Sequence, residues 1–287
     1  MNKTLVILNP AARSDKAARF QKQIRDLSAD FVLHTTSEFG EARRVASQGV
    51  VDGFETIVAA GGDGTINEVV NGLGGSTVRL GILPVGTVNV LAQEIGLPQG
   101  NLREAWRIIE QGKTIALDLP MANGQYFIQL AGVGLDAEVV RRTTTDLKKT
   151  FGPLSYILSL IQIASARPPK LILETEGWPP REGCFALIGN GRLYGGPFPL
   201  FKRASSSDGL LDVVVFKNQS HWDVVRYFQA IAFGKHEELP DVEYFQTPSL
   251  RVSGPEGVPV ELDGELAGAV PCEFRISPTK LNVIAPV

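Results

Sequence analysis

Three glycines around one acidic residue, at Gly61, Gly62, Asp63 and Gly64, form the sharpest chemical feature of the sequence. They follow an apolar strand-like run and precede a segment whose apolar residues recur with helical spacing. Glycines let the backbone turn tightly, so that amide N–H groups and the helix N-terminus can face a phosphate. The pattern indicates a phosphate-binding loop, although it matches neither the Walker nor the dinucleotide motif. Thr65 and Glu68 have capping-box spacing, which predicts a helix from about residue 65.

Three acidic sites could carry phosphoryl transfer, which needs Mg²⁺ to neutralise charge and a group to accept the proton of the acceptor hydroxyl. Asp63 could hold a hydrated Mg²⁺ or stabilise the helix N-terminus. Asp263 and Glu265 lie where a strand runs into a glycine turn, and Asp208 precedes another apolar run. Taken alone, both Asp-Gly patterns are typical of turns.

The elements that position the phosphate loop alternate between strand and helix. Such alternation, with short and nearly all-apolar strands, predicts a parallel sheet with helices on both faces. The expected strands span 4–8, 30–35, 55–60 and 79–83, and the expected helices span 14–28, 38–50, 65–73 and 102–112. We therefore expect an α/β domain over residues 1–120.

The rest of the chain reads as short strands separated by Gly, Pro and Asn turns, which predicts a mainly antiparallel β-sandwich domain over residues 121–287. One strand is expected just before the boundary, at 113–119. The strands that follow are expected at 125–131, 170–175, 184–189, 210–217, 248–253, 258–262 and 272–276, with helices near 153–166 and 220–233.

Composition narrows the class of protein. A net charge of -3 and a pI near 5.7 argue against a nucleic-acid binder. The two cysteines and three histidines have no zinc spacing, which argues against a zinc hydrolase. No apolar run approaches the roughly 20 residues that span a bilayer. We expect a soluble, cytoplasmic protein.

Several segments together resemble one family. GGDGTINEVVNGL resembles the signature of the diacylglycerol kinase catalytic-domain family, which includes bacterial lipid kinases and is related to sphingosine and ceramide kinases. Asn9-Pro10, Thr36 with Gly40-Glu41-Ala42, and the stretch 83–98 resemble further family segments. AGVGLDAEVV, GNGRLYGG, SSSDGLLDVVVF and ELDGE follow in the family's order. NAD kinases share a shorter GGDGT, but they are not expected to show the last two segments.

This resemblance implies an ATP-dependent kinase that phosphorylates a hydroxyl of a lipid such as diacylglycerol or a sphingoid lipid, with its active site in the cleft between two domains. It places the general base at Glu265, with Asp263 as rival or helper. It places a structural Mg²⁺ at Ser205, Asp208 and Leu210. The residues expected around ATP and Mg²⁺ are Asn9, Thr36, Gly61, Gly62, Asp63, Gly64, Thr65, Asn67 and Thr87.

The sequence departs from the family pattern in three places. Val90 stands where many members have Asp, Glu41 replaces Asp, and GGPFPLFKRA replaces a GGGM segment that is followed by AP, which leaves the acceptor pocket open. GVGLDA at 132–137 fits a variant of the dinucleotide motif, but no acidic residue follows at the required distance. We therefore reject a nicotinamide site there.

An apolar, helix-like segment at 151–165 has basic flanks that would suit an anionic membrane surface, although an ordinary core helix would show the same pattern. The flanking residues are Arg141, Arg142, Lys148, Lys149, Arg167 and Lys170. We expect peripheral contact with the inner membrane face.

The alternative functions are an NAD kinase-like enzyme and a catalytically inactive nucleotide- or lipid-binding regulator. The sequence specifies neither the acceptor lipid nor whether the chain forms a homodimer.

Overall fold

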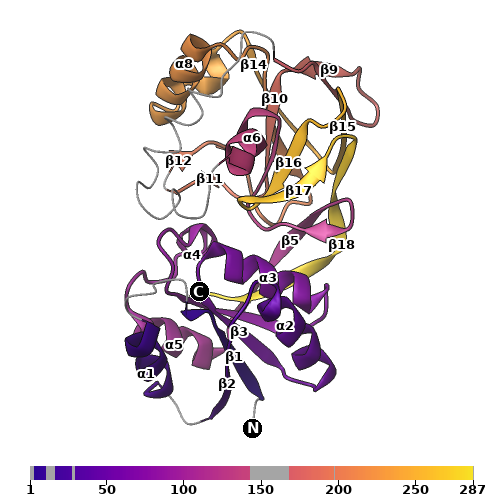
Figure 1. The fold of residues 1–287 in the computed structure, drawn as a ribbon. Coiled ribbons are helices and arrows are strands. Elements are labelled where there is room, and N and C mark those ends of the chain that lie inside the picture. Colours follow the sequence, from indigo (N-terminus) through magenta and orange to yellow (C-terminus); the bar gives the residue numbers. More distant parts are fainter. Residues whose placement is uncertain (1–2, 11–16, 28–29, 143–167, 197, 287) are drawn as a thin grey trace. The chain divides into compact units, whose positions relative to one another are not determined.

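The computed structural model describes residues 3–10, 17–27, 30–142, 168–196 and 198–286 (Figure 1). The chain forms two compact units: unit 1 is Met1–Leu119 with Ser277–Val287, and unit 2 is Pro120–Ile276. Two strands, β5 (Thr114–Ala122) and β18 (Cys272–Ile284), carry the chain out of unit 1 and back into it. Unit 1 is therefore built from both ends of the chain.

Unit 1 contains a parallel sheet. Its strands lie in the order β2 (Phe31–Thr35), β1 (Thr4–Leu8), β3 (Thr56–Gly61) and β4 (Arg79–Pro84). The end of β18 continues the sheet, because Val283 pairs with Leu80 of β4 in parallel. Strand β3 is buried along its whole length, which explains why it reads as a continuous apolar run.

Helices cover both faces of this sheet. On one face, Gly49 of α2 (Glu41–Val51) lies against Leu5 and Ile57. On the other face, Gly81 of β4 lies against Val58 and Ile109 of α5. Neighbouring residues of a strand point to opposite faces, so Ile57 faces the helix layer that contains α2 and Val58 faces the layer that contains α5. Helices α2 and α3 lie side by side (Figure 1). The remaining bounds are α1 (Ala17–Arg25), α3 (Asp63–Leu73), α4 (Val90–Glu94) and α5 (Leu102–Gln111).

Unit 2 is a β-sandwich. One sheet has the order β18, β15 (Ser249–Ser253), β8 (Leu171–Glu174), β9 (Arg181–Gly183). The other has the order β14 (Val242–Thr247), β13 (Leu211–Phe216), β10 (Phe185–Gly189), β7 (Leu130–Val133), β16 (Pro259–Leu262), β17 (Glu265–Ala269). All their pairings within unit 2 are antiparallel. Shorter strands are β6 (Gln125–Tyr126), β11 (Leu193–Tyr194) and β12 (Phe198–Pro199).

The six-stranded sheet is buried on both faces. Val213 and Val215 of β13 belong to the core between the two sheets. Val214 and Phe216 belong to a second core with α6 (Leu135–Arg142) and α8 (His221–Ala232). A short helix, η2 (His236–Glu238), follows α8. The predicted combination of a parallel α/β unit and an antiparallel sandwich is confirmed.

Some predicted boundaries were wrong. Helix α3 begins at Asp63 with Gly62 as N-cap and without a side-chain cap, so the predicted box of Thr65 and Glu68 does not start it. The Glu68 carboxylate instead accepts the Ala42 N–H of α2 at 3.1 Å. The single strand expected at 125–131 is divided into β6 and β7. The helix expected near 153–166 lies outside the described residues. Within the described part of the chain, no helix has the length and apolar character needed to span a membrane.

Candidate functional site

Two glycine-containing loops, which follow the carboxyl ends of strands β3 and β4, contact each other. The Gly61 carbonyl accepts the N–H groups of Val85 and Gly86 at 3.2 and 3.1 Å. A Cβ atom added to Gly86 would lie 2.4 Å from the Cα of Gly62. The two loops therefore pack backbone against backbone, and no side chain fits between them at this point. This explains why both segments carry glycine.

Asp63 joins these loops through its carboxylate. Its Oδ2 accepts the Asn89 N–H at 3.0 Å and its Oδ1 accepts the Val90 N–H at 2.6 Å. These amides open α4, so Asp63 places a negative charge at the N-terminus of that helix. Asn89 adopts a left-handed conformation (φ 54°) and exchanges two hydrogen bonds with the Gly86 backbone. The geometry gives Asp63 a structural role beyond the two that we expected.

The other residues expected around the nucleotide follow the ends of β1, β2 and β4. Asn9 donates its side-chain N–H to Thr65 Oγ1 at 3.0 Å, and Thr36 donates its hydroxyl to the Leu8 carbonyl at 3.3 Å. Thr87 is exposed on the loop after β4. Asn67 differs, because its buried side chain accepts a hydrogen bond from Asn71 within α3 at 3.0 Å. The carboxyl edge of a parallel sheet is where such sheets bind ligands.

Glu41, the residue that replaces the family's Asp, organises the start of α2. Its carboxylate accepts the Ser37 N–H at 2.6 Å and lies 2.8 Å from His34 Nε2. The hydrogen bond from the Ser37 backbone, followed by the one from His34, lowers the pKa of Glu41 to about 2. Glu41 thus binds the turn that leads into α2, while Gly40 is the N-cap residue and the helix has no side-chain cap.

Asp263 lies in the tight turn between β16 and β17, and Glu265 follows that turn. Asp263 and Gly264 have positive φ angles of 48° and 86°, as a two-residue type I′ turn requires. The Asp263 carboxylate accepts three backbone N–H groups, from Ile128 at 2.7 Å, Gln129 at 3.0 Å and Leu130 at 3.1 Å. Asp263 therefore ties the turn to the segment before β7. Glu265 opens β17 and is half-buried.

A pair of buried acids beneath this hairpin was not predicted. Glu261 of β16 and Asp136 of α6 are 1% and 3% exposed, and their carboxyl groups face each other beside Gly132. Burial, followed by the charge of Asp136, raises the pKa of Glu261 well above its usual range. Both acids lie in segments that we compared with the family, but no local pattern distinguishes a buried acid from a solvated one.

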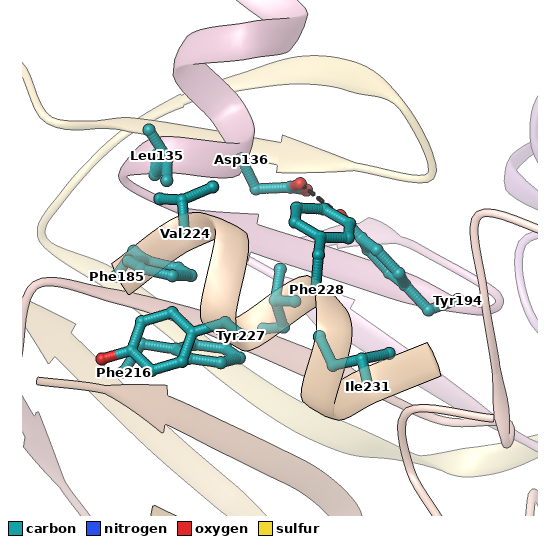
Figure 2. Close-up of a pocket in the computed structure, with 10 residues that line it drawn as sticks. Leu135, Asp136, Phe185, Tyr194, Phe216, Val224, Tyr227, Phe228 and Ile231 are labelled. Atoms are coloured by element: carbon teal, nitrogen blue, oxygen red, sulfur yellow. Dashed lines mark hydrogen bonds between the residues drawn. The ribbon is translucent and has the colours of Figure 1, made fainter. Parts of the chain in front are cut away.

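The same region borders an apolar pocket of unit 2. Figure 2 shows Asp136 joined to Tyr194 by a hydrogen bond of 2.7 Å, with aromatic and aliphatic side chains around them. The lining residues come mainly from β10, β13, α6 and α8 and are Leu135, Asp136, Phe185, Leu187, Tyr194, Phe216, Val224, Tyr227, Phe228 and Ile231. The cavity among them is about 20 Å³, room for about one water molecule, so this region is packed core and not a preformed ligand site.

The three residues expected at a structural Mg²⁺ share one exposed turn. The Asp208 N–H donates to the Ser205 carbonyl at 3.3 Å, and the Leu210 N–H donates to Asp208 Oδ1 at 3.0 Å. One carboxylate with nearby carbonyl oxygens is a donor set that Mg²⁺ can complete with water. Across the described ranges, no group of three or more His, Cys, Asp or Glu side chains could hold a metal. The site therefore stays a prediction based on one carboxylate.

Asp118, which was not predicted as a functional residue, forms an ion pair in unit 1 with its own side chain buried. Its side chain is 1% exposed and accepts from Lys280 Nζ at 2.9 Å. The pair joins β5 to β18, the two strands that connect the units. An Asp within an apolar run was the only signal in the sequence.

Comparisons with known proteins agree with this arrangement. Residues 3–122 match the diacylglycerol kinase catalytic domain, and residues 130–285 match the YegS C-terminal NAD kinase beta sandwich-like domain. A diacylglycerol kinase of Bacillus subtilis (strain 168) is 30% identical over 294 residues, which cover 100% of this chain and 97% of that protein. A "Probable lipid kinase YegS-like" of Pseudomonas aeruginosa (strain UCBPP-PA14) is 33% identical over 271 residues, covering 91% and 87%.

A solved structure extends the similarity to the fold. A Bacillus anthracis str. Sterne protein, provisionally named a diacylglycerol kinase, superposes with a TM-score of 0.84 at 26% identity, covering 99% of this chain and 95% of that one. The chain therefore belongs to the diacylglycerol kinase family and is a lipid kinase, an enzyme that transfers a phosphoryl group to an alcohol.

Proposed function

We propose that this lipid kinase uses ATP with Mg²⁺ as phosphoryl donor and a hydroxyl of diacylglycerol or a sphingoid lipid as acceptor. The observation that carries the proposal is the close packing of the Gly61–Gly64 loop on the loop at Gly86. Loops without intervening side chains let a phosphate approach the backbone N–H groups at the start of α3. Asn9, Thr36, Thr65 and Thr87 surround the nucleotide in this proposal.

Asp63 would hold the hydrated Mg²⁺ of the donor. The two amide hydrogen bonds fix its carboxylate in place, and a carboxylate has about four lone-pair sites, so metal binding is compatible with them. When bound, Mg²⁺ neutralises charge on the phosphate oxygens. Asn67 also stays a predicted nucleotide-binding residue, with its side-chain oxygen accepting a hydrogen bond from Asn71 inside α3.

Glu265 is the general base in this proposal, and Asp263 positions it. The Asp263 oxygens accept three backbone amides, which makes that carboxylate a poor proton acceptor for a substrate. Glu265 accepts the proton of the lipid hydroxyl as the hydroxyl oxygen forms its bond to the γ-phosphorus. The bond from phosphorus to the β–γ bridging oxygen breaks, and ADP leaves.

The remaining partner predictions concern unit 2. We propose that unit 2 binds the lipid and that Ser205, Asp208 and Leu210 hold a structural Mg²⁺ away from the reacting groups. Peripheral contact with the inner membrane face depends on residues 141–170, of which 143–167 lie outside the described residues, and it stays a prediction.

Radiolabelled ATP and Mg²⁺, offered with a panel of diacylglycerol, sphingosine, ceramide, phosphatidylglycerol and NAD, test the proposal. We expect label on a lipid and none on NAD. Glu265→Gln should lower turnover by about 10²- to 10⁴-fold, the usual contribution of a general base, with unchanged ATP affinity in calorimetry. Glu256→Gln is a matched control, because Glu256 is an exposed loop carboxylate.

The other outcomes separate the alternatives. Label on NAD alone would replace the lipid acceptor with a dinucleotide. ATP binding without ADP release, against every acceptor, would favour an inactive regulator. Near-normal turnover of Glu265→Gln would remove Glu265 as the base while leaving the acceptor assignment intact.

A further inference from the structure

The buried acids Glu261 and Asp136 face each other at one point in unit 2. Glu261 pairs across strands with Gly132, and a Cβ atom at Gly132 would lie 2.6 Å from Asp136 Oδ2 and 2.8 Å from Glu261 Oε1. Only glycine at this position leaves room for both carboxyl groups. The glycine that gives GVGLDA its likeness to a dinucleotide motif is therefore explained by the acid pair.

In each acid of the pair, one carboxyl oxygen accepts a hydrogen bond from outside the pair. The Tyr194 hydroxyl donates to Asp136 Oδ1 at 2.7 Å, and the Gly264 N–H donates to Glu261 Oε2 at 2.6 Å. Glu261 Oε1, by contrast, is buried and meets no N–H or O–H donor in the described part of the chain. A proton between the two carboxyl groups is the group that would satisfy it.

Electrostatics require the same proton. Two carboxylates in contact and out of water cannot both be ionised, so the pair keeps one proton at neutral pH. Asp136 lies in the first turn of α6 and accepts from Tyr194, and both features favour its ionised form. The proton therefore resides on Glu261, whose Oε1–H donates to Asp136 while Oε2 accepts from Gly264.

Gly264 connects this pair to the proposed catalytic residue. Its N–H lies in the turn between Asp263 and Glu265, and Leu262 pairs with Glu265 across that turn. Asp263 fixes one side of the turn through the amides before β7, and Glu261 fixes the other side. We propose that Glu261 and Asp136 share one proton and, through Gly264, act as positioning residues that hold Glu265 in place.

This inference rests on the proposed role of Glu265, but the shared proton does not. Three other ionisable groups lie close: Asp263 adds negative charge near Glu261, Tyr194 donates to Asp136, and Glu265 opens the neighbouring β17. The further charges on α6 are paired with one another, since Glu138 binds Arg141 and Arg142. Strand β7 carries no ionisable side chain.

The test measures unfolding temperature against pH from 5 to 9 for the intact protein, Glu261→Gln and Asp136→Asn. A folded Glu261 with a raised pKa holds a proton that the unfolded chain releases above about pH 4.5, so wild-type stability falls as pH rises, by up to about tenfold in the folding equilibrium per pH unit. A glutamine amide keeps the same two hydrogen bonds without titrating. The unfolding temperature of Glu261→Gln should therefore rise relative to wild type as pH increases.

Glu138→Gln is the matched control on α6. Burial opposes ionisation there, but hydrogen bonds from Arg141 and Arg142 lower the pKa of Glu138, so its glutamine variant should show no such rise with pH. Parallel curves for wild type and Glu261→Gln would overturn the shared proton.

Turnover against pH tests the positioning role. Wild-type kcat should fall at alkaline pH, where the pair loses its proton, with KM for ATP unchanged, and Glu261→Gln should extend the active range upward. An unaltered alkaline limb in Glu261→Gln would overturn the positioning role. If Glu265→Gln were fully active, the proposed base would fail, yet the unfolding curves would still decide whether the proton is shared.

Discussion

At the scale of single residues, acids of the same type perform different tasks because their surroundings differ. Asp63 and Asp263 both accept backbone amides, and Glu41 accepts from Ser37 and His34. Glu261 instead faces another carboxyl group in a buried site. Hydrogen-bond donors favour the ionised form, whereas burial next to a like charge favours the protonated form. Residue type alone could not separate these roles.

Asp263 provides the residue-scale prediction. Asp263→Asn keeps a residue that tolerates the left-handed backbone, but its side-chain NH₂ must face an N–H group. We expect a loss of about 1.5–3 kcal/mol in the free energy of unfolding, because amide hydrogen bonds to a charged acceptor are lost. Chemical denaturation should detect this loss, and turnover per folded molecule should fall, because Asp263 positions Glu265, but by less than in Glu265→Gln.

The contrasting variant is Glu265→Gln, which should lose turnover while its stability stays close to wild type. If Asp263→Asn instead lost turnover at undiminished stability, Asp263 would be the base and the assignment would be reversed. The two variants together thus settle the choice that the sequence left open between these carboxylates.

At the scale of elements, local patterns predicted the long buried segments well and the short ones poorly. Strands β1 and β3 and helix α5 are apolar or amphipathic over enough residues to be recognised. Helix α4 has five residues and follows a left-handed Asn89, so it is too short to show a helical spacing of apolar residues in the sequence. The contacts of Asp263 join residues more than 130 positions apart, and no local pattern encodes them.

The contact between α2 and α3 provides the element-scale prediction. A Cβ atom at Gly72 would lie 2.4 Å from the Arg43 carbonyl oxygen and 2.6 Å from the Ala46 Cβ. Gly→Ala in a helix interior ordinarily stabilises by about 0.5–1 kcal/mol. Here the helices would have to separate, so we expect Gly72→Ala to destabilise by about 1–3 kcal/mol in denaturant unfolding.

Gln48→Ala, at an exposed position of α2, serves as the control and should change stability by less than about 0.5 kcal/mol. A stabilised Gly72→Ala protein would mean that α2 and α3 can move apart without cost. The phosphate loop would then have a less rigid support than its position at the start of α3 indicates.

At the scale of the whole molecule, unit 1 combines segments from both ends of the chain, which the sequence patterns did not predict. The sequence placed every residue after 120 in a second domain, whereas Ser277–Val287 packs with the N-terminal unit. Strand β18 belongs to unit 2 where it pairs with β15 and to unit 1 where Val283 pairs with Leu80. The sequence predicted only 272–276 of this strand, because polar residues and a proline separate its two apolar ends and hide the change of partners.

This topology makes the proposed binding of ATP depend on the C-terminal segment. Truncation after Ile276 removes four buried apolar residues of unit 1, Leu281, Val283, Ile284 and Ala285. At about 1.5–3 kcal/mol for each of the three larger side chains, the loss approaches the whole stability of a typical domain. We expect the truncated protein to lose ATP binding in calorimetry and helical signal in circular dichroism, although Gly61–Thr65 is intact. Truncation after Ala285 keeps these side chains and should bind ATP normally. Wild-type affinity in the shorter protein would show that unit 1 forms without its C-terminal strand.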